Sequence, residues 1–141
     1  MDSILNIAAS SMSAENERLT MIARNIANSS TIGSSPQETY RAKHPIFSEV
    51  QENLIGIIPS EQPIGGVRIT GVYKSNNPLD WRLEPGNPLA DKDGKVYITD
   101  VNPINEMADM ISASKQYQAS VEVLTTAKDL KMQVIKAINN I

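Results

Sequence analysis

Hydrophobic and polar residues recur at helical spacing at both ends of this 141-residue chain, and that spacing is lost in the middle. Toward the C-terminus the apolar residues follow steps of three and four, with Ser114 filling one gap, which places them on one face of a helix. This stripe consists of Met107, Met110, Tyr117, Val121, Leu124, Ala127, Leu130, Val134, Ala137 and Ile141. We predict a helix that Asn102 caps and Pro103 opens, because Asn accepts hydrogen bonds from first-turn amides and Pro lacks an amide there. At about 1.5 Å per residue it would be roughly 58 Å long, too long for so short a chain to cover.

A second helical stripe occupies residues 3–28. Its steps of three and four persist for about three heptads, a pattern typical of coiled-coil pairing. The stripe has Glu15 as its one polar member and otherwise contains Leu5, Ala8, Met12, Leu19, Ile22 and Ile26. A cluster of Asn, Ser, Thr, Gly and Pro over residues 28–36 predicts where this helix ends.

Between the two helices, Pro and Gly become frequent and helical periodicity disappears. Short extended segments are predicted at residues 40–43, 46–47, 67–70, 81–83 and 96–98. Turns are predicted at residues 84–88 and 91–94, which combine Pro, Gly, Asn and Asp. Residues 51–64 follow no clear pattern, so we expect a loop or a short irregular connection there.

These patterns predict an α+β fold. The two long terminal helices would pair as an antiparallel coiled coil, with a small β-rich or irregular insert between them. The predicted segments are 1–33 for the N-terminal helix, 34–101 for the insert and 102–141 for the C-terminal helix. Apolar faces that the pair does not bury would meet other copies or other chains.

Composition narrows the functional classes. The net charge is −3, so no basic surface for nucleic acid is expected. The C-terminal helix has four acids and four bases, which does not suit binding to anionic lipid. There is no Cys, so neither a disulfide framework nor a Cys-ligated metal site is expected. No stretch predicts a cleavable signal peptide or a membrane span.

Catalytic residues are difficult to identify. The single histidine, His44, directly precedes Pro45 in an extended segment, which favours a surface or turn position. Gly65-Gly66 lacks the surrounding residues of a phosphate-binding loop. We therefore predict no catalytic residue and no cofactor.

An acidic stretch near the predicted turns was considered as a calcium loop. Aligning Gly94 with the glycine of an EF-hand loop puts Asp91 and Asp93 at the third and fifth positions. The first position then falls on Leu89, and the twelfth is Asp100 where Glu is expected. The stretch favours a polar β-turn, and no metal site is predicted.

Several segments together resemble the bacterial flagellar basal-body rod proteins, most closely a short subunit of the proximal rod. The matching residues are Arg18-Leu19, Ala23-Arg24-Asn25-Ile26-Ala27-Asn28, Tyr40-Arg41-Ala42-Lys43 with Phe47, Glu84-Pro85-Gly86-Asn87-Pro88-Leu89-Ala90-Asp91 with Gly94 and Val96, Asp100-Val101-Asn102, Glu106-Met107, and residues 113–121. The turn Pro85, Gly86, Asn87 and Pro88 together with the helix at 113–121 is the most specific part. A mild departure is Lys95, which stands where the family usually has an aromatic residue.

The resemblance implies a non-enzymatic structural subunit of the rod that crosses the periplasm as the drive shaft of the motor. Such a subunit would leave the cell uncleaved through the flagellar type III export apparatus. It would polymerise helically with other rod proteins and further copies of itself, and would meet membrane-ring and export-gate components at the rod base. Its terminal helices would form the inner tube, and direct insertion into the membrane is not implied.

The expected assembly interface follows the two stripes and the asparagines of the family motif. It comprises Leu5, Met12, Leu19, Ile22, Asn25, Ile26, Asn28, Met107, Met110, Tyr117, Val121, Leu124, Leu130 and Val134. Asn25 and Asn28 either cap the helix end or bond to a neighbouring subunit. The alternative function is a soluble coiled-coil adaptor or export chaperone, which would form a closed dimer and not an open helical assembly.

Overall fold

The computed structural model describes residues 2–50 and 65–139 and has an α+β architecture. Its elements are α1 (Asp2–Ala27), β1 (Ile32–Gly33), β2 (Lys43–Glu49), β3 (Val67–Lys74), β4 (Trp81–Leu83), β5 (Lys95–Ile98) and α2 (Pro103–Asn139). The two helices enclose the strands in sequence, as predicted. The predicted connection at residues 51–64 lies outside the described residues.

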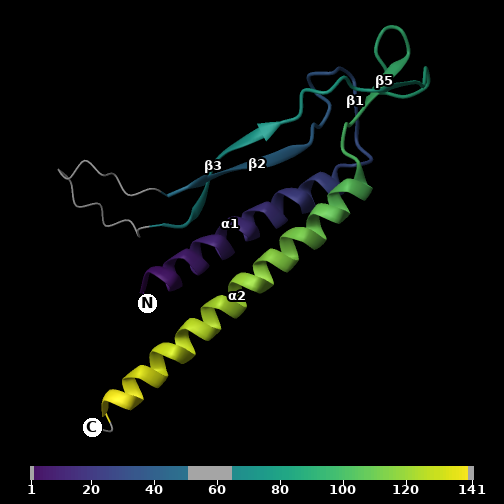
Figure 1. Cartoon of the computed structure of the whole chain (residues 1–141). Coiled ribbons are helices and arrows are strands. Elements are labelled where there is room, and N and C mark those ends of the chain that lie inside the picture. The colour runs from purple at the N-terminus through teal and green to yellow at the C-terminus, as the bar shows by residue number, and fades with distance from the viewer. Residues whose placement is uncertain (1, 51–64, 140–141) are drawn as a thin grey trace, which may run out of the picture.

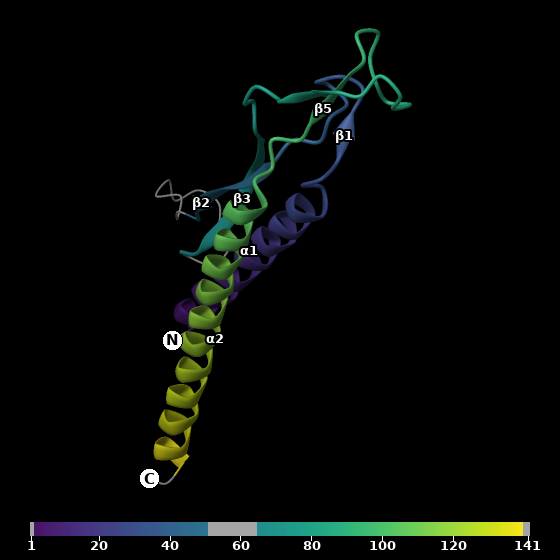
Figure 2. The same cartoon turned by 90° about the vertical axis from the view of Figure 1, so that its right-hand side faces the viewer.

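The helices α1 and α2 lie side by side and run antiparallel (Figures 1 and 2). The hydroxyls of Ser11 and Ser120 are 3.0 Å apart, and Asn25 Nδ2 donates to Glu106 Oε2 at 3.1 Å. A residue later in α1 thus contacts a residue earlier in α2, as expected for an antiparallel pair. Because α1 has 26 residues and α2 has 37, the C-terminal part of α2 extends past the start of α1 (Figure 1). We call residues 131–139 the overhang.

The ends of α2 agree with the sequence prediction. Asn102 Oδ1 accepts the amide hydrogens of Ile104 at 3.0 Å and Asn105 at 3.3 Å, which confirms the predicted N-cap. Pro103 is the first helical residue. The helix is therefore fixed at its start by local chemistry before any packing is considered.

Burial between the helices recurs at intervals of seven residues, and four of the seven positions carry Ala or Ser. The buried positions of this seam are Ala8, Glu15 and Ile22 on α1 and Glu106, Ala113, Ser120 and Ala127 on α2. Small side chains let the helix axes approach closely. On α1 the predicted stripe matches, since its remaining members Leu5, Met12, Leu19 and Ile26 are half-buried.

On α2 the predicted stripe lies beside the buried positions, and this part of the prediction is only partly right. Met110, Tyr117 and Leu124 flank the seam and are half-buried, whereas Met107 and Leu130 are 54% and 51% exposed. The reason is that apolar residues are spread around α2, so apolar spacing alone does not identify the face that meets α1.

The β2–β3 hairpin lies along the face of α1 that points away from the seam (Figure 1). Val67 N donates to Ser10 Oγ at 3.2 Å, and Phe47 and Val67 lie near Ala14. The register shifts between Ile46 and Phe47, where β3 has one extra residue, and this bulge bends the hairpin.

The other sheet has the order β1-β5-β4 and lies where α1 ends and α2 begins (Figures 1 and 2). The predicted strands at 67–70, 81–83 and 96–98 are confirmed, and β3 extends further to Lys74. The predicted extended segment at 40–43 differs, because β2 begins only at Lys43. Strand β1 was missed because its two residues fall within the predicted turn cluster.

Hydrophobic burial outside the seam is slight. Ala42, Val96 and Val101 are the buried apolar residues of the described insert and its junction with α2. The described residues therefore form a thin core.

Of the helices in residues 2–50 and 65–139, neither is long and apolar enough to span a bilayer.

Gly33 in β1 provides a test of how the insert is anchored. A Cβ at this position would lie 2.9 Å from the backbone N and Cα of Thr39, so the buried turn would have to shift. We expect Gly33→Ala to lower the free energy of unfolding of the insert by about 1–3 kcal/mol. Urea unfolding followed by the fluorescence of Trp81, the single tryptophan, measures this.

Gly86→Ala is the matched control, because nothing lies within 4 Å of a Cβ at Gly86. It should change the free energy of unfolding by no more than about 0.5 kcal/mol. Equal effects of the two substitutions would contradict the packing of Gly33 against Thr39.

Candidate functional site

The side chain of Asn25 joins three segments at the end of the helix pair where α1 ends and α2 begins. Its Nδ2 donates to the backbone oxygen of Lys43 at 2.9 Å and to Glu106 Oε2 at 3.1 Å. Its Oδ1 accepts from the backbone N of Lys43 at 3.0 Å and from the hydroxyl of Tyr40 at 2.9 Å. Both donor hydrogens and both acceptor positions of the carboxamide are used, and the residue is completely buried.

Electrostatics favour the protonated hydroxyl of Tyr40 at this junction. Burial raises the pKa of Tyr40, the negative charge of Glu106 raises it further, and the positive charge of Arg24 opposes the shift. Tyr40 therefore stays neutral and can donate its hydrogen to Asn25. Glu106 is only 4% exposed, so this carboxylate depends on the amide of Asn25 as a buried donor.

The second asparagine of the motif acts differently. Asn28 Nδ2 donates to the backbone oxygen of Arg24 at 2.8 Å, and its backbone N bonds to the same oxygen at 3.2 Å. The capping interpretation is thus confirmed for Asn28. For Asn25 the structure shows a bond network within the chain in place of a cap.

The middle of the seam contains charged residues. Arg18 places Nη1 3.6 Å from Glu15 Oε2 on the same helix and Nη2 3.7 Å from Asp109 Oδ1 on α2, so one ion pair of modest strength links the two helices. Within the described part of the chain, Glu15 Oε2 is buried and accepts no hydrogen bond. Such a buried carboxylate oxygen can still accept a hydrogen bond from another donor.

The predicted family-motif turn is confirmed as a hydrogen-bonded structure. Asn87 Nδ2 donates to Glu84 Oε2 at 2.7 Å, and Asn87 Oδ1 accepts from Leu89 N at 2.9 Å. The bond from Asn87 is the main reason why the pKa of Glu84 is lowered. Pro85, Gly86 and Pro88 lie in the same turn, which projects from the end of the β5–β4 pair.

The polar β-turn interpretation of the neighbouring acidic stretch also holds. Asp91 Oδ1 accepts from the backbone N of Asp93 at 2.9 Å and of Lys95 at 2.8 Å. The bond from Lys95 is the main cause of the lowered pKa of Asp91. Lys95 also places its ammonium 4.8 Å from the ring centroid of Trp81 on β4, a favourable cation–π distance.

No candidate for catalysis or metal binding emerges from the described residues. Within 2–50 and 65–139, no three His, Cys, Asp or Glu side chains are grouped so that they could hold a metal ion. His44 is half-buried in β2 and pairs with Tyr73 on β3.

Apolar side chains cover much of the outer surface of α2. The exposed ones are Ile104, Met107, Ile111, Val123, Leu130, Met132, Val134, Ile135 and Ile138. Their spacing places them around the whole helix and not on one face. The buried seam positions recur every seven residues up to Ala127, and the next such position, Val134, lies beyond α1 and is 46% exposed.

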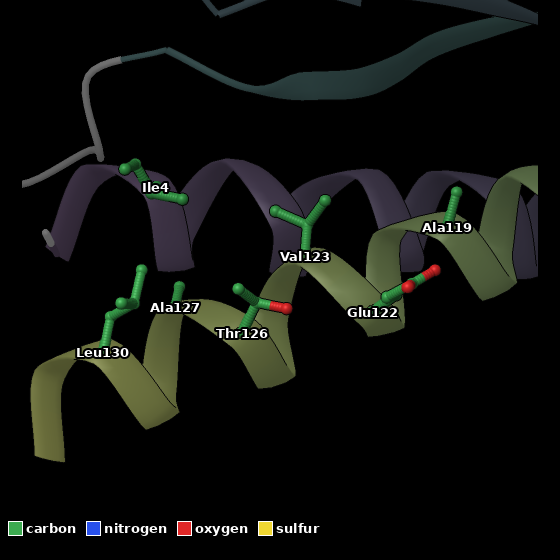
Figure 3. Close-up of a pocket in the computed structure, with 7 residues that line it drawn as sticks. All are labelled: Ile4, Ala119, Glu122, Val123, Thr126, Ala127 and Leu130. Atoms are coloured by element: carbon green, nitrogen blue, oxygen red, sulfur yellow. The ribbon is translucent and has the colours of Figure 1, made fainter. Parts of the chain in front are cut away.

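A groove runs along one side of the seam near the start of α1. It is lined by Ile4 on α1 and by Ala119, Val123, Ala127 and Leu130 on α2. Figure 3 shows the side chains of Val123, Ala127 and Leu130 projecting from α2 toward the helix that carries Ile4. The groove is predominantly apolar, with Glu122 and Thr126 at its edge.

The predicted interface residues divide into two sets. Those of α1, together with Met110, Tyr117, Val121 and Leu124, lie at or beside the contact between α1 and α2. Leu130 lines the groove beside that contact, whereas Met107 and Val134 are exposed away from it. Sequence reasoning missed Glu106, Ser120 and Tyr40 as contact residues. A weak signal for the first two was present, because both lie on the seven-residue repeat that includes Ala113 and Ala127.

Comparison with known proteins agrees with the sequence motifs. A family model described as flagellar basal body rod FlgEFG protein C-terminal matches residues 92–137. A flagellar basal-body rod protein FlgC from Buchnera aphidicola is 41% identical over 135 residues, covering 94% of this chain and 93% of the relative. The FlgC proteins of Salmonella typhimurium and Borreliella burgdorferi are 36% and 34% identical, over 94% and 91% of this chain and 93% and 91% of the relatives.

Asn25→Asp tests the junction. The substitution keeps the size of the side chain but removes both donated bonds and puts a second carboxylate beside Glu106. We expect a loss of about 3–5 kcal/mol in the free energy of unfolding, because a buried charge would be left unpaired. Urea unfolding followed by circular dichroism measures this loss.

Asn28→Asp serves as the control, since it removes one bond at a half-buried helix end. Its cost should be about 1 kcal/mol or less. A loss as large as that of Asn25→Asp would show that the network of Asn25 has no special weight.

Proposed function

The chain belongs to the flagellar basal-body rod proteins of the FlgC type, and from this membership we propose how its surfaces serve the rod. It is a structural subunit of the bacterial flagellar rod, whose role is that of a drive shaft in motility. In our proposal it polymerises helically with other rod proteins and with further copies of itself. The polymer transmits torque across the periplasm.

The observation that carries this proposal is the distribution of apolar residues on α2. Ile111, Val123 and Ile135 are 59%, 49% and 48% exposed in the single chain, yet their spacing of twelve residues places them on different sides of one helix. A surface helix of a single globular domain normally gathers its apolar residues on the one face that meets the core. Since α1 covers only one face, neighbouring subunits are the natural source of the remaining cover.

The axial core in this proposal is built from segments 1–33 and 102–141, paired as an antiparallel coiled coil. The seven-residue spacing of the buried positions Glu106, Ala113 and Ser120 supports such a pairing. The insert, residues 34–101, would lie outside the core, in keeping with its position along α1 and at one end of the helix pair (Figure 1).

The route and the neighbours follow from the family. We propose that the chain passes through the flagellar type III export apparatus without cleavage of its N-terminus and is assembled in the periplasmic rod. Membrane-ring and export-gate components would be its neighbours at the rod base. Its relatives are named as rod proteins, which supports a structural and non-enzymatic role.

Incorporation into basal bodies tests the proposal. Val134→Asp puts a charge at the seam position beyond α1, where the single chain loses no contact to α1. We expect normal helicity and export but little of this variant in purified basal bodies and a loss of motility, because the charge would be buried in the polymer. Immunoblots of basal bodies and swimming assays measure this.

Gln133→Asp is the matched control, an exposed polar residue one position earlier on the same helix. It should incorporate and support swimming. If Val134→Asp behaved like this control, the assignment of the outward apolar face to assembly would fail.

Hydrogen exchange tests whether assembly orders the helices. Helices take most of their stability from packing, and the seam of this pair is narrow and partly polar. We expect weak amide protection of α1 and α2 in dilute monomer and strong protection in assembled rods. Strong protection of both helices in the monomer would contradict coupling of folding to polymerisation.

A further inference from the structure

The apolar groove beside the seam continues into a polar niche. Ile4, Ala119 and Val123 line the groove and also an adjoining hollow, which Ser11 and Gln116 line as well. Ser11 and Gln116 in turn line the polar niche around Glu15. The hollow therefore follows one side of the helix pair without a break. From Leu130 to Gln116 it extends over about 21 Å of helix axis at 1.5 Å per residue.

The inner end of the hollow has a feature that points to a cationic guest. Glu15 lines the niche, is 8% exposed, and presents the buried oxygen that accepts no hydrogen bond from the described residues. Arg18 lines the same niche and forms an ion pair with that oxygen at 3.6 Å, a separation that leaves the oxygen without a hydrogen bond. The hydroxyls of Ser11 and Ser112 and the amide of Gln116 add polar groups around it.

The overhang has the chemistry that this hollow would accept. Residues 131–139 contain two lysines and no acid. Met132, Val134, Ile135 and Ile138 are all exposed there, because α1 does not reach that far. The overhang spans about 12 Å of helix axis, so it fits within the length of the groove.

We propose that the overhang of one copy docks in the groove of a second copy. The apolar side chains of the overhang would cover Ile4, Ala119 and Val123, and the ammonium of Lys136 would approach Glu15. The two surfaces are different parts of the chain, so the contact is head-to-tail and leaves a free groove and a free overhang at the ends. This inference rests on the proposed assembly into a rod and names the surfaces that join two copies.

Cross-linking in trans tests the pairing, since the natural chain has no Cys. Two differently tagged copies, Ala119→Cys and Ile138→Cys, are expressed together, basal bodies are purified, and a short bismaleimide is added. We expect a covalent dimer that carries both tags. Gln118→Cys in place of Ala119→Cys is the matched control, because it is exposed on α2 but points away from the groove, and should give no such dimer.

The outcomes separate this inference from the proposed function. Basal bodies that contain both copies but no mixed dimer would overturn the docking, as would cross-links from Ala119→Cys to a different protein only, and membership in the rod would stand. Absence of the chain from basal bodies would overturn both.

The charge contact has its own test. Lys136→Glu should lower the yield of mixed dimer, normalised to incorporated chain, by at least about tenfold. Lys92→Glu in the exposed turn of the insert should leave the yield unchanged. An unchanged yield with Lys136→Glu would overturn the pairing of Lys136 with Glu15.

Discussion

The four hydrogen bonds of the Asn25 side chain are the constraint on which the rest of the molecule depends. They join the last turn of α1, the start of β2 and the first turn of α2 at one buried point. A fully satisfied carboxamide in a low-dielectric site fixes orientation as well as distance, because each bond is directional. The insert therefore leaves the helix pair in a defined direction, although few apolar contacts hold it there.

The residues between α1 and α2 fix the register of the two helices but contribute little to the free energy of unfolding. Its polar members Glu106 and Ser120 contribute little hydrophobic energy, but each meets its hydrogen-bond partner on α1 only in one register. Polar residues in helix seams are known to select register at a cost in stability. Many of the larger apolar side chains of α2 are exposed instead, so much of its apolar surface is not buried within the single chain.

Caps, turns and short strands could be predicted from the sequence, whereas the helix face that contacts a given partner could not. The cap at Asn102, the turn at Asn87 and the strand at Trp81 depend on neighbouring residues, and all three were predicted. The predicted stripe of α2 was displaced from the observed seam because apolar residues lie on several sides of this helix, and their spacing does not tell which side meets α1. Glu106 was missed because an acid in the first turn of a helix normally faces solvent, and only its bond to Asn25, 81 residues away, explains its burial.

Strand β1 has a consequence for how this architecture can change over time. It pairs with β5 immediately after α1 ends and shortly before α2 begins, so the entry and exit of the insert are clamped together. What lies between these two points is attached to the helices as a closed lobe. A lobe of another length or sequence would meet the helices at the same two points and leave their register unchanged. The lobe can thus change in the course of evolution without a change in how the two helices pair.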